Sequence, residues 1–192
     1  MNYNKLFDNF PVIENDNILM KQIEIEDLKD YIEINMNEEL YRFKPGEPRK
    51  TAVAVENIIG HHIRDFHKRI IINLGIFLKN DAGKMIGVAE IFDVDPRVNA
   101  VTIGYTLNQN YWGRGIAANS TALLLNYLFK EIEVNRVQAF VMPQNGKSKN
   151  VLLRNKFIKE GTIRQGTFWK GRGIVDLELY SILKEEYSKD CQ

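Results

Sequence analysis

The chain has 192 residues, of which 44% are hydrophobic and 27% are charged. These fractions are typical of soluble globular proteins, so they exclude a disordered or fibrous chain and predict one domain, residues 1–192, with a core of about 18–183. Lysine plus arginine (26) nearly balances aspartate plus glutamate (25). That balance argues against a protein whose main task is binding nucleic-acid phosphates, and we expect no direct nucleic-acid partner.

Signals for export or membrane insertion are not expected. Residues 1–17 hold acidic and amide residues where a signal peptide has a basic start and an apolar run. No later stretch is long and apolar enough to span a bilayer. The only cysteine, Cys191, cannot form an intrachain disulfide. We therefore expect a cytoplasmic protein with no membrane partner.

The first part of the chain is predicted to alternate between a strand and two helices. Residues 18–25 (ILMKQIEI) indicate a strand, and the amphipathic run 26–39 that follows indicates a helix. Two prolines and a glycine make residues 41–50 a loop. Residues 51–68 show a second helical pattern. The apolar face of this second helix comprises Val53, Val55, Ile58, Ile59, Ile63 and Phe66.

Three β-rich runs come next, at residues 70–78, 85–94 and 100–107. Short turns, which contain Asp81-Ala82-Gly83 and Asp95-Pro96, connect them and predict an antiparallel meander. Leucines and a tyrosine then recur at helical spacing from Ala117 to about Glu131, which predicts an amphipathic helix.

The last part of the chain continues the alternation. A strand, RVQAFVM, precedes a loop that opens into a short helix within residues 143–157. Two final strands, about 158–169 and 174–183, are joined by a glycine-bearing turn at 170–173. The resulting order is strand, two helices, three strands, helix, strand, helix and two strands, which predicts a mixed α/β structure with one sheet.

The most informative local feature is the segment WGRGIA, residues 112–117, between a predicted strand and a predicted helix. Glycine lets the backbone approach a ligand closely. Amide N–H groups at the positive end of a helix bind phosphate groups well. The segment can therefore be a pyrophosphate cradle, and the alternative is a glycine-rich turn that only starts the helix.

Further motifs accompany this segment in a fixed order: IGYTL at 103–107, YWGRGIA at 111–117, the NxxS element at 145–148, RNKF at 154–157 and DLELYSIL at 176–183. In these motifs and their spacing the chain resembles the GNAT superfamily of acetyltransferases over about residues 18–183. Within that superfamily it is most similar to the Rim-type ribosomal-protein N-acetyltransferases.

The resemblance implies an α/β (α+β) fold with a single mixed, mostly antiparallel sheet that is splayed at its centre and has helices on both faces. The pantetheine arm of acetyl-CoA would lie in the gap between the fourth and fifth predicted strands and pair with the backbone of Leu107. Backbone amides would bind the pyrophosphate along Trp112, Gly113, Arg114, Gly115, Ile116 and Ala117. Trp112 departs from the family's Gln or Arg at the first motif position, and backbone donors tolerate such a change.

Two polar residues of the NxxS element have roles in the family. Asn145 matches the asparagine that contacts the cofactor arm, and Ser148 matches a hydroxyl near the thioester sulfur. A hydroxyl there can protonate the departing thiolate, a general-acid role that depends on hydrogen-bond reach. Both residues are also common at helix N-caps, so helix capping is the alternative for each.

The general base is less clearly marked. Strand alternation places Glu90 on one face with Ile86, Val88 and Phe92, so a carboxylate interrupts an apolar row. Glu90 is the candidate base, and a salt bridge on the sheet is the alternative, because buried charges are usually paired. Some Rim-type enzymes have a glutamate near the position of Phe168, and this chain has none. Asp176, Glu178 and Tyr180 also share one face of the last predicted strand.

No metal site is expected. His61, His62 and His67 lack the i, i+4 spacing of helical metal ligands, so we interpret them as solvated helix residues.

The predicted reaction is transfer of acetyl from acetyl-CoA to a primary amine, with a protein N-terminal amine as the favoured acceptor and no covalent enzyme intermediate. The loop 41–50 and the hairpin end 168–173 are expected to form the walls of the amine cleft. A small amine, such as an antibiotic, a polyamine or an amino acid, is an alternative acceptor. A non-catalytic acyl-CoA-binding module is a second alternative, and the protein is expected to be a monomer or a homodimer.

Overall fold

The computed structural model describes residues 1–81 and 83–189 of the chain, so Ala82 of the predicted turn and Cys191 lie outside the described residues. Its eight strands are β1 Ile13–Glu14, β2 Ile18–Gln22, β3 Ile71–Leu78, β4 Met85–Asp95, β5 Ala100–Leu107, β6 Arg136–Val141, β7 Ile158–Trp169 and β8 Gly173–Leu183. Its α-helices are α1 Tyr3–Asp8, α2 Leu28–Asn35, α3 Ala52–His67, α4 Ile116–Asn126, α5 Gly146–Arg154 and α6 Lys184–Lys189.

The predicted order of strands and helices between residues 18 and 183 is confirmed. The sequence prediction did not include α1, β1 and α6, nor the 3₁₀ turns η1 (Ile25–Asp27), η2 (Glu38–Arg42) and η3 (Gln109–Tyr111). Helix α4 continues into a π-helical turn, η4 (Tyr127–Glu131), which completes the predicted helical run. Short terminal elements carry too few residues for a periodic signal.

All eight strands form one sheet in the order β1-β2-β3-β4-β5-β6-β8-β7. Every neighbouring pair is antiparallel except β5 and β6. Strands β5 and β6 pair only over residues 100–102 and 136–138. Beyond these residues β5 stays with β4 and β6 stays with β8, so the predicted splay at the sheet centre is confirmed.

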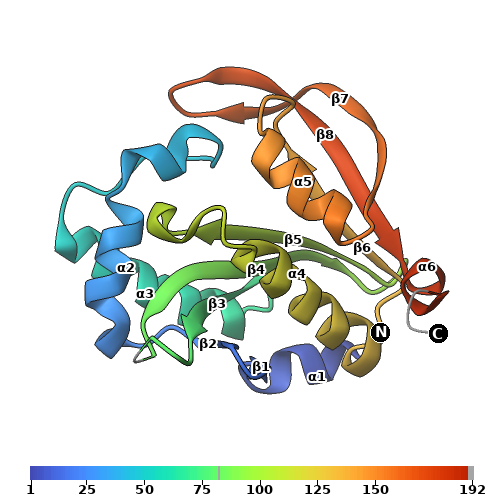
Figure 1. Ribbon diagram of the computed structural model, residues 1–192, viewed down its shortest axis with the longest axis horizontal. Helices are drawn as coiled ribbons and strands as arrows, with labels where there is room; N and C mark the ends of the chain where they lie inside the picture. The colour runs from blue at the N-terminus through green and yellow to red at the C-terminus, as the bar shows by residue number, and fades with distance from the viewer. Residues whose placement is uncertain (82, 190–192) are drawn as a thin grey trace.

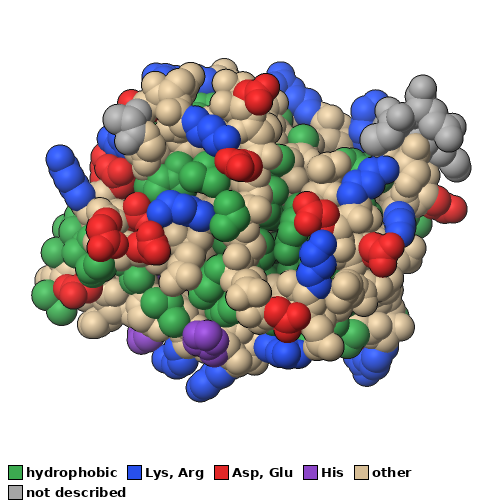
Figure 2. All heavy atoms as spheres, turned by 90° about the horizontal axis from the view of Figure 1, so that it is seen from below, with side chains coloured by type: hydrophobic (Ala, Val, Ile, Leu, Met, Phe, Trp, Pro, Cys, Tyr) green, Lys and Arg blue, Asp and Glu red, His purple; other side chains and the backbone are tan. Residues whose placement is uncertain are grey.

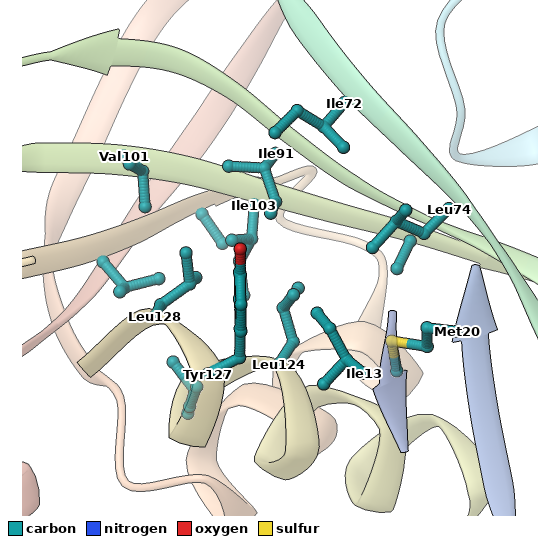
Figure 3. Close-up of a cluster of buried hydrophobic side chains, with 14 of the residues drawn as sticks. Ile13, Met20, Ile72, Leu74, Ile91, Val101, Ile103, Leu124, Tyr127 and Leu128 are labelled. Carbon is teal, nitrogen blue, oxygen red and sulfur yellow. The ribbon is translucent and has the colours of Figure 1, made fainter. Parts of the chain in front are cut away.

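Helices cover both faces of the sheet (Figure 1). On one face, side chains of β3, β4 and β5 pack against α1 and α4 in the larger buried cluster. Figure 3 shows part of this contact, with Leu124, Tyr127 and Leu128 beneath Ile91, Val101 and Ile103. On the other face, α2 and α3 pack against Phe77, Met85 and Val88 in the smaller cluster. Leu6 of α1 is fully buried, so side chains before residue 18 also join the core.

A β-bulge changes the facing of one predicted residue. Strand alternation places Ile86 on the same face as Val88 and Glu90, but the β3–β4 register shifts between Ile76 and Phe77. Ile86 therefore packs in the larger cluster, while Val88 packs in the smaller one on the opposite face. The prediction for Ile86 is wrong because a bulge adds one residue and breaks the period of two.

The apolar stripe of α3 is narrower than predicted. Val55, Ile59 and Phe66 are buried, whereas Val53 is 64% exposed. The buried positions recur at intervals of four and seven residues, which places His62 on the same stripe.

The molecular surface agrees with the balanced composition. On the face shown in Figure 2, acidic and basic side chains are intermingled. Among residues 1–81 and 83–189, no helix is both long and apolar enough to cross a membrane.

Candidate active site

A cavity of about 810 Å³ lies beside the edge of β5 that the splay leaves unpaired. Four parts of the chain form its walls: the end of β5, the turn that leads into α4, the first turns of α5, and η2 with the loop after it. The predicted cofactor residues that line it are Leu107, Trp112, Gly113, Gly115, Ile116, Ala117 and Asn145. The fold therefore brings together segments that are far apart in the sequence.

The turn before α4 has the geometry of an open backbone cradle. Gly113 and Gly115 both have a φ of +76°, in the left-handed region, and Gly115 is the N-cap of α4. A Cβ at either glycine would meet no atom within 4 Å. The space above the backbone is therefore open, and the first amides of α4 are available to an anion.

The backbone N–H of Trp112 is not available for the phosphate contact that was predicted for it. Its own N–H donates to the carbonyl oxygen of Gln109 (3.1 Å), so the amides free for a phosphate begin at Gly113. Its indole Nε1 donates to the carbonyl oxygen of Leu107 (2.7 Å). The Trp112 indole thus joins the turn to the end of β5. The family's Gln or Arg at this position would need a different side-chain contact to do so.

The backbone of Leu107 faces the gap between β5 and β6. Asn108 donates its N–H across to Ile86 of β4 (2.8 Å), so alternation directs the backbone groups of Leu107 and Tyr105 the other way. The Leu107 carbonyl is already bonded to Trp112. The N–H of Leu107 is therefore the group that could donate a hydrogen bond to a pantetheine amide.

Basic side chains surround the cradle. Lys147 and Arg154 of α5 line the cavity, and the Lys147 ammonium lies 4.6 Å from the centre of the Trp112 ring. Arg114 does not line the cavity, since its guanidinium lies over the Tyr111 ring at 5.3 Å. The side chain of Arg114 therefore points away from the cavity, and its backbone amide is the group that the sequence analysis assigned to the cradle.

We expect Gly115→Val to weaken binding of CoA at least tenfold, about 1.4 kcal/mol. The new side chain would enter the open space above the cradle and also strain the left-handed backbone. Gly83→Val is the matched control, because Gly83 has a φ of +69°, equally open space and no place in the cavity. Titration calorimetry with CoA measures the effect, and equal affinities of the two folded variants would exclude the cradle.

Asn145 and Ser148 behave differently in the structure. Asn145 is the N-cap of α5, and its Oδ1 accepts the N–H of Ser148 (3.1 Å), so the capping alternative for Asn145 is observed. Ser148 lies in the first turn of the helix and is not the cap. Its Oγ accepts a hydrogen bond from the hydroxyl of Tyr105 (3.3 Å), and both residues line the cavity.

Tyr105 is a site residue that the sequence analysis missed as a side chain. Burial raises the pKa of its hydroxyl, and its hydrogen bond to Ser148 opposes that rise. Tyr105 therefore stays protonated near neutral pH and donates to the Ser148 oxygen, which leaves the Ser148 hydrogen free for a second partner. Its place in IGYTL gave no signal, because the contact joins residues 43 positions apart.

Glu90 does not line this cavity, although its carboxylate leans toward β5. Glu90 pairs across the sheet with Gly104, and a Cβ at Gly104 would lie 2.8 Å from Glu90 Oε2. The missing side chain of Gly104 thus gives the carboxylate room on the face of the sheet that α2 and α3 cover, whereas alternation directs the Tyr105 side chain to the opposite face. No ion pair of Glu90 occurs among the described residues, so the salt-bridge alternative has no partner there.

Buried hydroxyl groups lie near Glu90 on the same face of the sheet. The negative charge of Glu90 contributes to the raised pKa values of Tyr31 and Tyr41, although burial is the largest cause for both. Tyr41 donates to Asn35 Oδ1 (3.3 Å), and the Asn35 side-chain amide donates to the Tyr31 carbonyl (3.0 Å). These hydrogen bonds connect η2 to α2.

His62 is not a solvated residue, as the sequence analysis expected. Its Nε2 lies 2.6 Å from the Tyr31 hydroxyl, and burial together with the charge of Lys44 lowers the pKa of the ring to about 4. The ring is therefore neutral near pH 7, and its Nε2 accepts a hydrogen bond from the Tyr31 hydroxyl. The expectation is wrong because His62 lies on the buried stripe of α3. Among the described residues no group of three or more potential ligands could hold a metal ion.

The free energy of unfolding is expected to fall by up to about 3 kcal/mol as pH decreases from about 6.5 to 4. In this window the unfolded chain binds a proton at His62 that the folded chain excludes, so folding becomes less favourable as pH falls. His62→Gln should flatten this part of the pH profile. Chemical unfolding at several pH values measures it, with His67→Gln, on the exposed side of α3, as the control. An identical slope in the two variants would contradict the assignment to His62.

The carboxylates of the last strand already have partners. Asp176 Oδ1 accepts the N–H of Gln165 (2.7 Å), which fixes a bulge in β7. Glu178 forms ion pairs with Lys159 (2.7 Å) and Lys149 (3.4 Å), and Tyr180 donates to it (3.0 Å). These groups therefore serve the packing of β7, β8 and α5.

The two predicted cleft walls contact each other. Lys170 Nζ forms an ion pair with Glu47 Oε2 (2.8 Å), and the Arg172 guanidinium lies 6.0 Å from the centre of the Phe43 ring. Figure 1 shows the end of the β7–β8 hairpin extending toward the segment after α2. Phe43 itself lines the cavity.

A carboxylate on α2 supports the turn that leads to the cradle. Glu33 accepts hydrogen bonds from the side-chain amides of Asn108 (2.8 Å) and Asn110 (3.4 Å) and pairs with Lys84 (3.2 Å). The Asn108 bond is the first cause of the lowered pKa of Glu33. Helix α2 and the cradle turn are therefore held together.

Comparison with known proteins gives a consistent result. Residues 17–158 match the family model described as "Acetyltransferase (GNAT) domain". The chain is 34% identical over 108 residues to the uncharacterized N-acetyltransferase p20 of Bacillus licheniformis (56% of this chain, 60% of that protein). It is 29% identical over 115 residues to the ribosomal-protein-serine acetyltransferase of Escherichia coli (60% and 63%). The chain thus spans less than two thirds of the length of either relative.

A solved structure with the same fold is that of RimJ from Mycobacterium smegmatis, in complex with CoA-disulfide. Its TM-score is 0.81 at 20% identity, over 94% of this chain and 90% of that one. At this identity the likeness establishes the fold alone. The family match, by contrast, covers most of the chain and includes β5, the cradle turn and α5. The chain therefore belongs to the GNAT family of acetyltransferases.

Proposed function

We propose that this protein transfers the acetyl group of acetyl-CoA to a primary amine, with the N-terminal amine of a protein as the acceptor. One observation carries the proposal: an open anion cradle at the start of α4 and a hydrogen-bonded hydroxyl pair, Tyr105 and Ser148, line the same cavity. A thioester whose pyrophosphate lies on the cradle can place its acyl end beside the unpaired edge of β5.

In the proposed mechanism the amine attacks the thioester carbonyl directly in a ternary complex. A new C–N bond forms, the C–S bond breaks, and the sulfur leaves as a thiolate. The backbone N–H of Tyr105, which points into the gap, would stabilise the charge on the carbonyl oxygen, because the Thr106 N–H points toward β4 and the Leu107 N–H would pair with pantetheine. Ser148 would donate its proton to the thiolate and regain one through its hydrogen bond from Tyr105, and Tyr105 would be reprotonated by solvent.

Glu90 is the proposed acceptor of the amine proton, directly or through one water. Its carboxylate lies above Gly104 of β5 and has no ion-pair partner among the described residues. The family's relatives include a ribosomal-protein-serine acetyltransferase, which supports a protein N-terminus as the acceptor. A cytoplasmic location is part of this proposal.

The test is an assay of thiol release from acetyl-CoA with a panel of N-terminal peptides and small amines, with mass spectrometry of the products. We expect a mass increase of one acetyl group on the peptide α-amine and one thiol released for each peptide modified. CoA binding without turnover of any acceptor would instead support an acyl-CoA-binding module.

A further inference from the structure

We infer that the acceptor carries an anionic group, a carboxylate, on the same molecule as its amine, and that Arg42 and Lys44 recognise it. This inference rests on the proposed function and specifies the substrate class of the same cavity. The carboxylate can come from an acidic residue near a peptide N-terminus or from a free α-amino acid. The chemistry that recognises it is the same for both sources.

The charges in the cavity wall support the inference. The wall formed by η2 and the loop after it contributes two cations, Arg42 and Lys44, and one carboxylate, Glu39. Lys147 and Arg154 lie at the opposite wall, on α5 beside the cradle, where a CoA molecule brings its own phosphates. Arg42 and Lys44 therefore have no counter-charge from the proposed position of the pyrophosphate.

The contacts of these cations are to aromatic rings. Arg42 lies 5.3 Å from the centre of the Phe43 ring, and Lys44 lies 5.6 Å from the centre of the Tyr41 ring. Within residues 1–81 and 83–189 neither cation forms an ion pair, whereas Lys170 of the facing hairpin is paired with Glu47. Two cations in a cavity wall without a carboxylate partner favour an anionic ligand.

A third cation lies close to the hydrogen-bonded tyrosines of α2 and η2. The positive charge of Arg49 opposes the rise in the pKa values of Tyr31 and Tyr41, and Lys44 lowers the pKa of His62. Glu90 is the carboxylate that acts on the same tyrosines. An acceptor carboxylate next to Arg42 and Lys44 in the cavity wall would meet opposite charge. A polyamine would meet two like charges instead, which disfavours it.

The experiment compares matched acceptors. One pair is the peptides Ser-Asp-Glu-Leu-Ala-Gly and Ser-Asn-Gln-Leu-Ala-Gly, a second pair is serine and serine amide, and spermidine is added alone. For each, kcat/KM is measured by thiol release, and the dissociation constant is measured by calorimetry on CoA-loaded protein. We expect the carboxylate-bearing member of at least one pair to be favoured at least tenfold, about 1.4 kcal/mol, with the preference weakening in high salt.

Substitution of the two cations tests their role. The double variant Arg42→Ala/Lys44→Ala should lose most of the preference for the acidic acceptor, while the KM for acetyl-CoA changes less than about twofold, about 0.4 kcal/mol. Lys50→Ala is the matched control, because Lys50 is exposed on the same loop and does not line the cavity. It should keep the preference. Thermal unfolding of all three proteins shows that they are folded.

The outcomes are separable. A preferred peptide assigns the acceptor to an acidic N-terminus, and a preferred free serine assigns it to an amino acid. Both support the inference. Equal use and equal binding of the acidic and neutral members overturns it, as does a preference for spermidine. An unchanged acceptor preference with a raised KM for acetyl-CoA in the double variant also overturns it. Absence of thiol release from every acceptor contradicts the proposed function, and the calorimetric comparison still decides whether the cavity selects an anionic amine.

Discussion

Glu90→Gln is expected to lower kcat/KM for the acceptor about 100-fold near pH 6. A 100-fold effect is at the lower end of the usual contribution of a general base. Glutamine keeps the size of the side chain above Gly104 but cannot accept the ammonium proton. An α-amine has a pKa of about 7.7–8.0, so most of the acceptor is charged at pH 6 and most is neutral at pH 9. The loss should therefore shrink as pH rises. Stopped assays across pH 6 to 9 measure it.

The control is Asp93→Asn, a change of the same chemistry on the exposed part of β4. It should leave the pH profile unaltered. Gly104→Ala provides an independent approach, since its methyl group would meet Glu90 Oε2 and displace the carboxylate. A uniform loss at every pH in a stably folded Glu90→Gln variant would remove Glu90 as the base.

Ser148→Ala is expected to lower kcat about 100-fold, because a general acid for the leaving thiolate acts mainly in the transition state. The dissociation constant for CoA should be nearly unchanged. Tyr105→Phe should lower kcat about tenfold, since the Ser148 hydroxyl remains but loses the hydrogen bond that orients its proton. The double variant should be no slower than Ser148→Ala alone, because the two hydroxyls act as a unit.

Ser120→Ala is the control for this series, because Ser120 is a buried helical serine outside the cavity whose Oγ has no hydrogen-bond partner among the described residues. Its activity should equal that of the wild type. Strictly additive losses in Ser148→Ala/Tyr105→Phe would contradict the coupled pair. A loss of CoA affinity with an unchanged kcat would make Ser148 a binding residue.

Features that depend on near neighbours in the chain were predictable from the sequence. The unbroken apolar, β-rich run in 71–78 and the helical spacing in 52–67 each identify an element, because both signals lie within the segment itself. The cradle was predictable for the same reason. Its glycines and the helix start are contiguous, so the left-handed turn at Gly113 and Gly115 is a local property.

Two predictions about which way a side chain faces were wrong, those for Ile86 and His62. Ile86 lies on the other face because a bulge adds a residue to β4 opposite Ile76 and Phe77. His62 is half-buried because the stripe of α3 that packs on the sheet includes its position, although histidine by itself favours neither side. The bulge has no signal in residue spacing, whereas the spacing of Val55, Ile59 and Phe66 does place His62 on the buried stripe.

The sequence by itself therefore determined the order of the elements, the cradle and the family motifs, since each depends on residues within one or two turns of the chain. Only the tertiary structure decided which side chains meet. Tyr105 reaches Ser148 because β5 separates from β6 and α5 lies beside the gap, and Glu90 reaches over Gly104 because β4 and β5 are in that register. Such distances depend on the packing of whole elements, which no single segment specifies.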